Sequence, residues 1–237
     1  MESTDLYQVK NGFVNLKTGQ FYENPDQNLE ENENLIEWKG IDYETTFIDN
    51  YVSQLVSQED KQKLQKILGC FISNNKEMIF LQIYGNGLNG KSTFINLFKQ
   101  ILGDRHTNID SSILTTNTSF NFNINEKMRV LTTEVYNSNK IKIGRIKELL
   151  SGDKIITKQV IYKPIQEQIN NISKVIIETR TPLVPEDNGF NRRSRSIKFT
   201  SKFNIDPTFK TELCNKLDEF LVWLVNGSIM YYNDKTL

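Results

Sequence analysis

The chain has 237 residues, and its 29 Lys and Arg balance its 29 Asp and Glu, which gives a formal net charge of zero. This balance excludes a uniformly basic nucleic-acid coat, so any contact with DNA has to come from local clusters of charge. The two cysteines, Cys70 and Cys214, lie far apart in apolar surroundings, which predicts a reducing compartment and no disulfide framework. His106 is the only histidine, so no metal-binding cluster of histidines and cysteines is expected. Because neither a signal-peptide pattern nor an apolar run of bilayer length is found, we expect an intracellular, soluble protein with no membrane partner, in a host compartment that the sequence leaves open.

The N-terminal third is expected to form small elements in front of a larger core. The Asn11-Gly12 pair predicts a tight hairpin, and Gly19 predicts a second turn. Two runs of apolar residues at helical spacing follow, separated by Ser57 as a helix cap. We therefore expect three parts: a hairpin and loop segment over 1–45, a helical layer over 46–75, and an ATPase core over 76–237.

The core begins with the most informative stretch of the chain. Residues 78–84 form a nearly unbroken apolar run, which is typical of a strand buried on both faces of a parallel sheet. A G-x-x-x-x-G-K-S motif follows, and then an amphipathic run that ends at Gly103. A strand, a glycine loop and a helix in this order are the context that a phosphate-binding Walker A loop requires.

The chemistry of phosphate binding explains the spacing of this motif. Gly85, Gly87 and Gly90 can adopt backbone angles closed to other residues, so successive N–H groups can turn toward a phosphate. Lys91 then reaches the β- and γ-phosphates, and the Ser92 hydroxyl ligates Mg²⁺. The predicted nucleotide-binding residues are Gly85, Asn86, Gly87, Leu88, Asn89, Gly90, Lys91, Ser92 and Thr93.

The remaining pattern alternates between strands and helices. After a polar stretch over 107–125, the chain is predicted to form core strands over 128–134, 175–177 and 196–199, with a helix over 143–150. Two β-prone pieces, 154–162 and 165–169, predict a hairpin with Lys163 at its tip. A single C-terminal helix is expected to start at Asp206 and to present apolar residues as far as Leu224. We predict an α/β fold: a P-loop NTPase core of AAA+ type, with a central, mainly parallel sheet flanked by helices.

Hydrolysis of a triphosphate requires a carboxylate for the attacking water and positive charge for the γ-phosphate. Glu134 stands at the end of its predicted strand, where open α/β sheets bind ligands. Arg192, Arg193 and Arg195 cluster before another strand, and one of them is a candidate arginine finger for a neighbouring subunit.

These motifs together resemble the superfamily 3 helicases, in the primase–helicase branch shared by phages, plasmids and large DNA viruses such as the poxviruses. The stretch 84–94 is close to the Walker A form of that branch, in which an Asn precedes the Gly-Lys pair. The stretch 127–134 resembles its Walker B motif, 146–162 the motif that supplies a DNA-binding hairpin, and 223–227 its closing helix. Arg192 and Arg193 resemble its arginine-finger segment.

The resemblance implies a role for each matching residue. Lys91 binds phosphate, Ser92 and Glu134 hold Mg²⁺, and Glu134 activates water. Arg193 is the first candidate for the finger, followed by Arg192. Lys163, followed by Lys158, contacts the DNA backbone in a central pore, as a sequence-independent point charge. The implied ligands and partners are ATP, Mg²⁺, single-stranded DNA, other copies of the chain in a ring such as a hexamer, and a primase or another replication protein; the implied direction of travel is 3′ to 5′.

Two positions depart from the family pattern. Thr133 stands where many P-loop ATPases carry the Walker B aspartate. At the sensor position, where the family has an asparagine, the chain has Thr179 or Arg180, depending on how Pro182 is aligned. This departure bears on the rate of hydrolysis more than on nucleotide binding.

We therefore expect an ATP-dependent DNA helicase. Two alternatives stay open: a P-loop ATPase that packages DNA or remodels complexes without unwinding, and a nucleotide-gated DNA-binding module with impaired hydrolysis. The length leaves no room for a primase module, so the chain is expected to be a stand-alone helicase or a part of a larger replication polypeptide.

Overall fold

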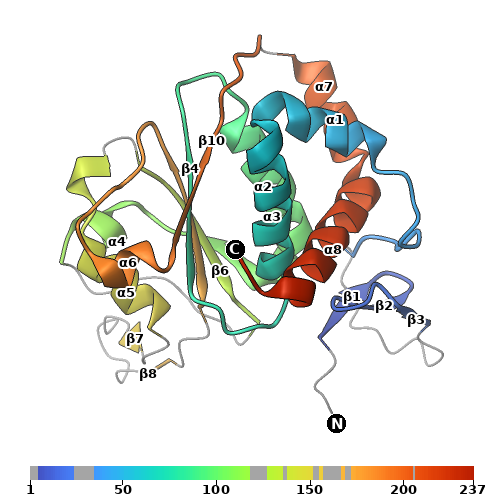
Figure 1. The fold of residues 1–237 in the computed structure, drawn as a ribbon, viewed down its shortest axis with the longest axis horizontal. Helices are drawn as coiled ribbons and strands as arrows, with labels where there is room; N and C mark the ends of the chain where they lie inside the picture. The colour runs from blue at the N-terminus through green and yellow to red at the C-terminus, as the bar shows by residue number, and fades with distance from the viewer. Residues whose placement is uncertain are drawn as a thin grey trace, which may run out of the picture. The chain divides into compact units, whose positions relative to one another are not determined.

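A five-stranded parallel sheet is the centre of one of the two units into which the chain divides (Figure 1). The computed structural model describes residues 5–23, 35–117, 127–135, 138–151, 155–156, 167–168, 172–204 and 206–237. The first unit comprises 1–75, 88–103 and 200–237, and the second, which holds the sheet, comprises 76–87 and 104–199. Each unit is therefore assembled from separate stretches of the sequence.

The strands of the second unit are neighbours in the order β10-β4-β9-β6-β5, and every pair is parallel. If the five strands are numbered along the chain, this is the order 5-1-4-3-2. The last two strands, β9 and β10, therefore lie on either side of the first, β4. The α/β fold and its parallel sheet are thus confirmed. The bounds are β4 (Ile79–Tyr84), β5 (His106–Asn108), β6 (Val130–Val135), β9 (Lys174–Thr179) and β10 (Ser194–Lys198).

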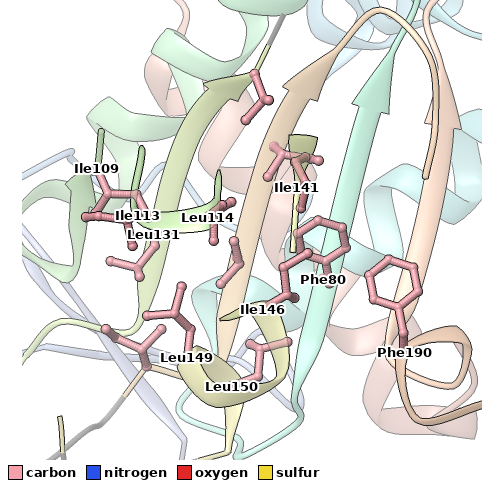
Figure 2. Packing of buried hydrophobic residues seen from close by; sticks show 14 of the residues in the cluster. Phe80, Ile109, Ile113, Leu114, Leu131, Ile141, Ile146, Leu149, Leu150 and Phe190 are labelled. Carbon is pink, nitrogen blue, oxygen red and sulfur yellow. The ribbon is translucent and has the colours of Figure 1, made fainter. Parts of the chain in front are cut away.

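Helices pack on this sheet and bury an apolar cluster (Figure 2). The ring of Phe80 on β4 lies 5.3 Å from the ring of Phe190, measured between centroids. Burial of such side chains is the main stabilising term of a core of this kind. The helices of the second unit are α4 (Ser112–Thr115), α5 (Ile143–Leu150) and α6 (Asn188–Asn191), with a 3-10 turn at Ser138–Lys140.

The first unit combines a small antiparallel sheet with helices. The two-residue turn Lys10-Asn11 joins β1 to β2, and Gly12 pairs with Val9 as the first residue of β2. Gly19, at φ 75°, lies in the turn before β3. The predicted hairpin and the second turn are therefore confirmed, and the hairpin turn lies one residue before the Asn-Gly pair. Its strands are β1 (Leu6–Val9), β2 (Gly12–Asn15) and β3 (Phe21–Glu23). Its helices are α1 (Thr46–Leu55), α2 (Gln58–Ile72), α3 (Lys91–Leu102), α7 (Pro207–Cys214) and α8 (Leu217–Asp234). A 3-10 turn over Gly103–Arg105 begins at the last residue of this unit's stretch 88–103 and continues into the second unit.

Glycines let two of these helices approach closely. A Cβ atom on Gly69 of α2 would lie 2.1 Å from the backbone nitrogen of Ser228 in α8, and one on Gly227 would lie 2.1 Å from the carbonyl oxygen of Gln65. Neither contact is possible for a larger residue without movement of the backbone. The two glycines therefore set the distance between α2 and α8.

The predicted single C-terminal helix is wrong, because two helices cover this stretch. Asp206 does cap the start, accepting hydrogen bonds from the N–H groups of Thr208 and Phe209. The first helix ends after Cys214, and Lys216 leaves the helical region, at φ −112° and ψ 27°, before α8 begins. The apolar spacing continues across this break because both helices bury side chains of the same unit, so periodicity alone cannot locate it.

Three short elements were not predicted, and one predicted hairpin is only partly described. The strand β5 and the helix α4 lie in the polar stretch over 107–125, and α6 precedes the arginine cluster. The pieces β7 (Ile155–Ile156) and β8 (Glu167–Gln168) pair antiparallel, as the hairpin prediction requires. Its tip lies outside the described residues. The predicted division at 45 and 75 stays a prediction, although one boundary between the two units also falls at 75. Among the residues described, no helix is both long and apolar enough to cross a bilayer.

Candidate nucleotide site

The Walker A segment leaves the carboxyl end of β4 in a strained turn. Gly85 has φ 143°, and its N–H donates a hydrogen bond of 3.2 Å to the carbonyl oxygen of Thr179. Gly90 has φ 83°. Gly87, in contrast, does not use the left-handed region, and Leu88 does so in its place, at φ 61°. A leucine in this conformation is uncommon, and such strain collects at functional sites.

The helix that follows begins without a side-chain cap. Its N-cap residue is Gly90, and the first helical hydrogen bond runs from the N–H of Phe94 to the Gly90 carbonyl, at 2.9 Å. An α-helix start of this kind, at the end of a glycine loop, is a favourable place for an anion because of the helix dipole. Ser92 is exposed in this first turn.

The side chain of Lys91 is hydrogen-bonded to Asn89, the asparagine that precedes the Gly-Lys pair. The Lys91 Nζ atom donates a hydrogen bond of 2.8 Å to Oδ1 of Asn89, whose side chain is buried. An amide oxygen is a weaker partner for an ammonium group than a phosphate. Asn89 therefore holds the Lys91 ammonium group in a defined position.

Glu134 lies where the sequence predicted, at the carboxyl end of β6, and its side chain is exposed. The structure adds a second carboxylate that was not predicted as functional. Glu178 on β9 is the direct partner of Glu134 in the parallel register, so both side chains emerge from the same face of the sheet. Glu178 is only 7% exposed. Its one signal in the sequence is a charged residue at the end of the apolar run 175–177.

The sensor position is occupied by two residues in different environments. Thr179 is buried, and its hydroxyl donates a hydrogen bond of 2.8 Å to the carbonyl oxygen of Thr181. The Thr181 hydroxyl in turn lies 2.9 Å from that of Ser138. Arg180, by contrast, is exposed. In this arrangement the Thr179 hydroxyl stabilises the turn after β9.

Thr133, at the aspartate position of the Walker B motif, is buried. Among the residues that the structure describes, its hydroxyl has no hydrogen-bond partner. A buried hydroxyl without a partner raises the free energy of the folded state by about 1–3 kcal/mol. The packing of the sheet therefore gives no reason for a hydroxyl group at position 133.

The arginine cluster lies at the opposite edge of the same sheet. The carbonyl of Arg193 accepts a hydrogen bond of 2.9 Å from the N–H of Phe80, near the amino end of β4. The Arg193 guanidinium donates to the Gly189 carbonyl at 2.8 Å and contacts Met78 Sδ at 3.9 Å. Arg192 is exposed.

The turn before these arginines is stabilised by charge. Asp187 caps α6 by accepting a hydrogen bond of 2.7 Å from the Phe190 N–H, and it pairs with Lys147 Nζ at 2.8 Å. The bond from Lys147, assisted by that from Phe190, lowers the pKa of the Asp187 carboxyl.

The structure thus brings some predicted residues together and leaves others apart. Gly85, Glu134 and Thr179 meet at the carboxyl edge of the sheet, and Arg192 and Arg193 lie at its amino edge. Lys91, Ser92 and Thr93 belong to the first unit, at the start of α3. Lys158 and Lys163, the predicted DNA contacts, lie outside the described residues.

Comparison with known proteins finds a distant similarity to a viral protein named as a helicase. A family of unknown function, DUF5906, matches residues 83–193. The helicase-named protein L207/L206 of Acanthamoeba polyphaga mimivirus is 27% identical over 216 residues, which cover 85% of this chain and 22% of that protein. The chain therefore spans about a fifth of this relative's length.

Solved structures share the fold. The apo structure of the NrS-1 C-terminal region aligns with a TM-score of 0.61 at 17% identity, over 78% of this chain and 47% of that one. A second apo structure of the same region, called the A form, aligns with a TM-score of 0.57 at 17% identity, over 76% of this chain and 44% of the other. Similarity at this level of identity concerns the fold alone.

Proposed function

We propose that this chain is the ATPase core of a superfamily 3 DNA helicase of viral or mobile-element replication, which moves along single-stranded DNA as a ring of identical subunits. The relationship to a mimivirus protein named as a helicase supports the general class. The superfamily, the nucleotide and the ring rest on the residues of the site.

The observation that carries this proposal is the order of the strands. Because β9 lies between β4 and β6, the start of the Walker A loop and Glu134 stand at one edge of the sheet, two strand spacings or roughly 10 Å apart. Ligands of open α/β sheets bind outside this carboxyl edge. A carboxylate on the far side of a phosphate-binding loop is the arrangement that hydrolysis of a triphosphate requires.

Magnesium is the metal that these residues would hold. Ser92 and Glu134 offer a hydroxyl and a carboxylate, which are the hard oxygen ligands that Mg²⁺ prefers. When bound, the ion neutralises charge on the β- and γ-phosphates. Glu134 would then orient the attacking water, and Glu178, its partner on the neighbouring strand, would lie beside it on the same face of the sheet.

The arginines support action between subunits. Arg193 neighbours the amino end of β4, so several residues of extended strand, roughly 15–20 Å, separate it from the loop at the other end. The Arg193 side chain cannot reach the start of the loop in its own chain unless this segment leaves the sheet. A second copy of the chain supplies the missing positive charge if its amino edge faces the loop. Among the residues that the structure describes, the Arg192 side chain has no hydrogen bond to give up, whereas the Arg193 side chain must exchange its bond to Gly189 for one to a phosphate.

One observation favours a second function, a nucleotide-gated DNA-binding module with impaired hydrolysis. The Thr179 hydroxyl, which stands at the predicted sensor position, is engaged by the carbonyl of Thr181. If this bond persists with nucleotide present, the γ-phosphate lacks the polar contact that the family's asparagine provides.

The decisive experiment measures ATP turnover and strand separation together. The purified chain is assayed with and without single-stranded DNA, and on a forked duplex, beside Lys91→Ala and Lys163→Ala. We expect turnover that DNA stimulates, unwinding that needs ATP, no turnover in Lys91→Ala, and a loss of DNA stimulation alone in Lys163→Ala. Turnover that is indifferent to DNA would indicate a packaging or remodelling ATPase, and binding without phosphate release would indicate the gated module.

A further inference from the structure

A glutamine is buried in β4, between the two edges of the sheet that carry the proposed site residues. Gln82 is fully buried, and in the parallel register it stands beside Ser196 of β10. Because side chains alternate along a strand, Gln82 lies on the same face as Phe80, which belongs to the apolar cluster of this unit. A buried amide in apolar surroundings raises the free energy of the folded state unless its polar atoms are hydrogen-bonded.

One pair of hydrogen bonds joins Gln82 to the backbone of Leu183. Its Oε1 accepts a hydrogen bond of 2.7 Å from the Leu183 N–H, and its Nε2 donates one of 3.2 Å to the Leu183 carbonyl. A backbone N–H can only donate, so this contact identifies the oxygen end of the amide. Residues 180–187, all within the described part of the chain, form neither helix nor strand. Gln82 therefore gives this segment the paired contact that a neighbouring strand would otherwise supply.

The same amide holds the start of β10. Its Nε2 donates to the hydroxyls of Ser194 and Ser196, at 2.8 and 3.1 Å. An amide nitrogen carries two hydrogens, so its three acceptors share them. Residues 183–194, the arginine loop, contain α6 and both candidate arginines, so the two ends of this loop are fixed at one side chain.

Other contacts limit movement within the arginine loop. Pro185 has a fixed φ angle, and its carbonyl accepts a hydrogen bond of 2.9 Å from the N–H of Asp187. Asp187 caps α6, and the Leu183 side chain packs against the apolar cluster. The arginine loop thus holds its arginines at the amino edge of the sheet as one unit, with Gln82 at its base.

We propose that Gln82 is a positioning residue for the arginine that one subunit offers to the nucleotide of the next. The inference rests on the proposed function, in which that arginine acts between subunits. Without the amide, the ends of the arginine loop are no longer tied to each other, so the guanidinium occupies less often the position that meets a γ-phosphate. A misplacement of about 1 Å at such a contact costs up to about 100-fold in rate. Gln82 acts through the arginine and not by contact with the nucleotide.

The test places Gln82→Leu on one side of a subunit junction at a time. Subunits with Lys91→Ala lack the phosphate-binding lysine but offer the arginine, and subunits with Arg193→Ala keep the lysine, so a mixture of the two turns over ATP where they meet. Arg192→Ala takes the place of Arg193→Ala if it is the variant that loses turnover. Phosphate release is measured at equal mixing ratios with saturating ATP.

The expected loss is on one side of the junction only. In the Lys91→Ala subunits, which supply the arginine, Gln82→Leu should lower the regained turnover about tenfold or more. In the Arg193→Ala subunits, which supply the loop, it should leave the regained turnover unchanged. Gln100→Leu, which alters an exposed glutamine, should leave both mixtures unchanged.

A second change keeps the proposal testable if Gln82→Leu does not fold. Ser194→Ala together with Ser196→Ala removes the acceptors on β10 and keeps the bonds of Gln82 to Leu183. In the Lys91→Ala subunits this double variant should lower the regained turnover about three- to tenfold. No loss there would overturn the proposed tie between the two ends of the arginine loop.

The remaining outcomes separate this proposal from the one on which it rests. Equal losses on both sides would show that Gln82→Leu damages the sheet as a whole, and no loss in the Lys91→Ala subunits would show that the arginine needs no such tie. Either result overturns the role of Gln82 and leaves the proposed function standing. If Lys91→Ala and Arg193→Ala regain no turnover with Gln82 intact, the proposed action between subunits is overturned, and the inference with it.

Discussion

The carboxylates and the arginines that the sequence singles out lie at different edges of the parallel sheet. At the carboxyl edge, Glu134 and Glu178 face the same side of adjacent strands, next to the turn at Gly85. At the amino edge, Arg192 and Arg193 precede β10, beside the first residues of β4. The strands hold the edges apart, so one chain cannot bring its own arginines to its own carboxylates.

This separation indicates which chain would supply the arginine of the proposed site. If a triphosphate binds at the carboxyl edge, as we propose, Glu134 lies at that edge, whereas Arg192 and Arg193 lie at the amino edge of the same sheet. We infer that another subunit supplies the arginine, and that hydrolysis therefore depends on the assembly.

The largest expected effect tests whether the amino edge acts across subunits. At least one of Arg192→Ala and Arg193→Ala should lower the ATP turnover number about 10³-fold, the lower bound for an arginine finger, with nucleotide binding retained. Mixing that variant with Lys91→Ala should restore part of the turnover, where an intact loop meets an intact finger. Turnover at full rate by a monomer, or no recovery at any mixing ratio, would contradict the division between the two edges.

The second largest expected effect distinguishes Glu134 from Glu178 at the carboxyl edge. Glu134→Gln should lower single-turnover phosphate release about 10²–10⁴-fold, because it removes the group that activates water. Glu178→Gln should lower it by only about tenfold, since this neighbour is buried and the attacking water is expected at the exposed Glu134. Rapid-quench assays at saturating ATP separate these losses from binding. Equal losses in the two variants would show that the carboxylates share one role.

A third change concerns Gln82, a side chain in the middle of β4 that connects this strand to β10 and to the segment at Leu183. Gln82, buried in β4, accepts a hydrogen bond of 2.7 Å from the N–H of Leu183 and donates to the hydroxyls of Ser194 and Ser196 at 2.8 and 3.1 Å. Gln82→Leu leaves these groups without partners and should lower the free energy of unfolding by about 1–3 kcal/mol. Denaturant unfolding measures this, with the exposed Gln100→Leu as the control that stays within about 0.5 kcal/mol.

The smallest expected effect is a pH dependence at the amino edge. The pKa of Asp187 is lowered in the folded chain by Lys147, so its ionised form stabilises the cap of α6 above the ordinary carboxyl pKa and is lost as the pH falls through the lower, folded value. Asp187→Asn should therefore melt slightly below the wild type at neutral pH. The difference should vanish on acidification in a series of thermal melts. A difference that grows toward low pH would show that Asp187 acts in another way.

Much of the local structure could be predicted because its causes are local. The hairpin of β1 and β2, the helix caps at Ser57 and Asp206 and the strand over 79–84 depend on neighbouring residues, and all are found. The break after Cys214 was missed because the apolar spacing runs through it, and β5 was missed because its three residues are polar and lie at the edge of the sheet.

The sequence by itself determined the glycine-rich motif between a strand and a helix, the parallel α/β class and the presence of a carboxylate at the end of a strand, since each follows from residue types at short spacing. Only the tertiary structure decided that β9 lies between β4 and β6, which pairs Glu178 with Glu134 and places the arginines at the far edge. It also decided that the N–H of Phe203 donates a hydrogen bond to the carbonyl of Leu88 and that both residues line one cavity. These arrangements depend on hydrogen bonds and packing between segments far apart in the chain, and no local pattern records them.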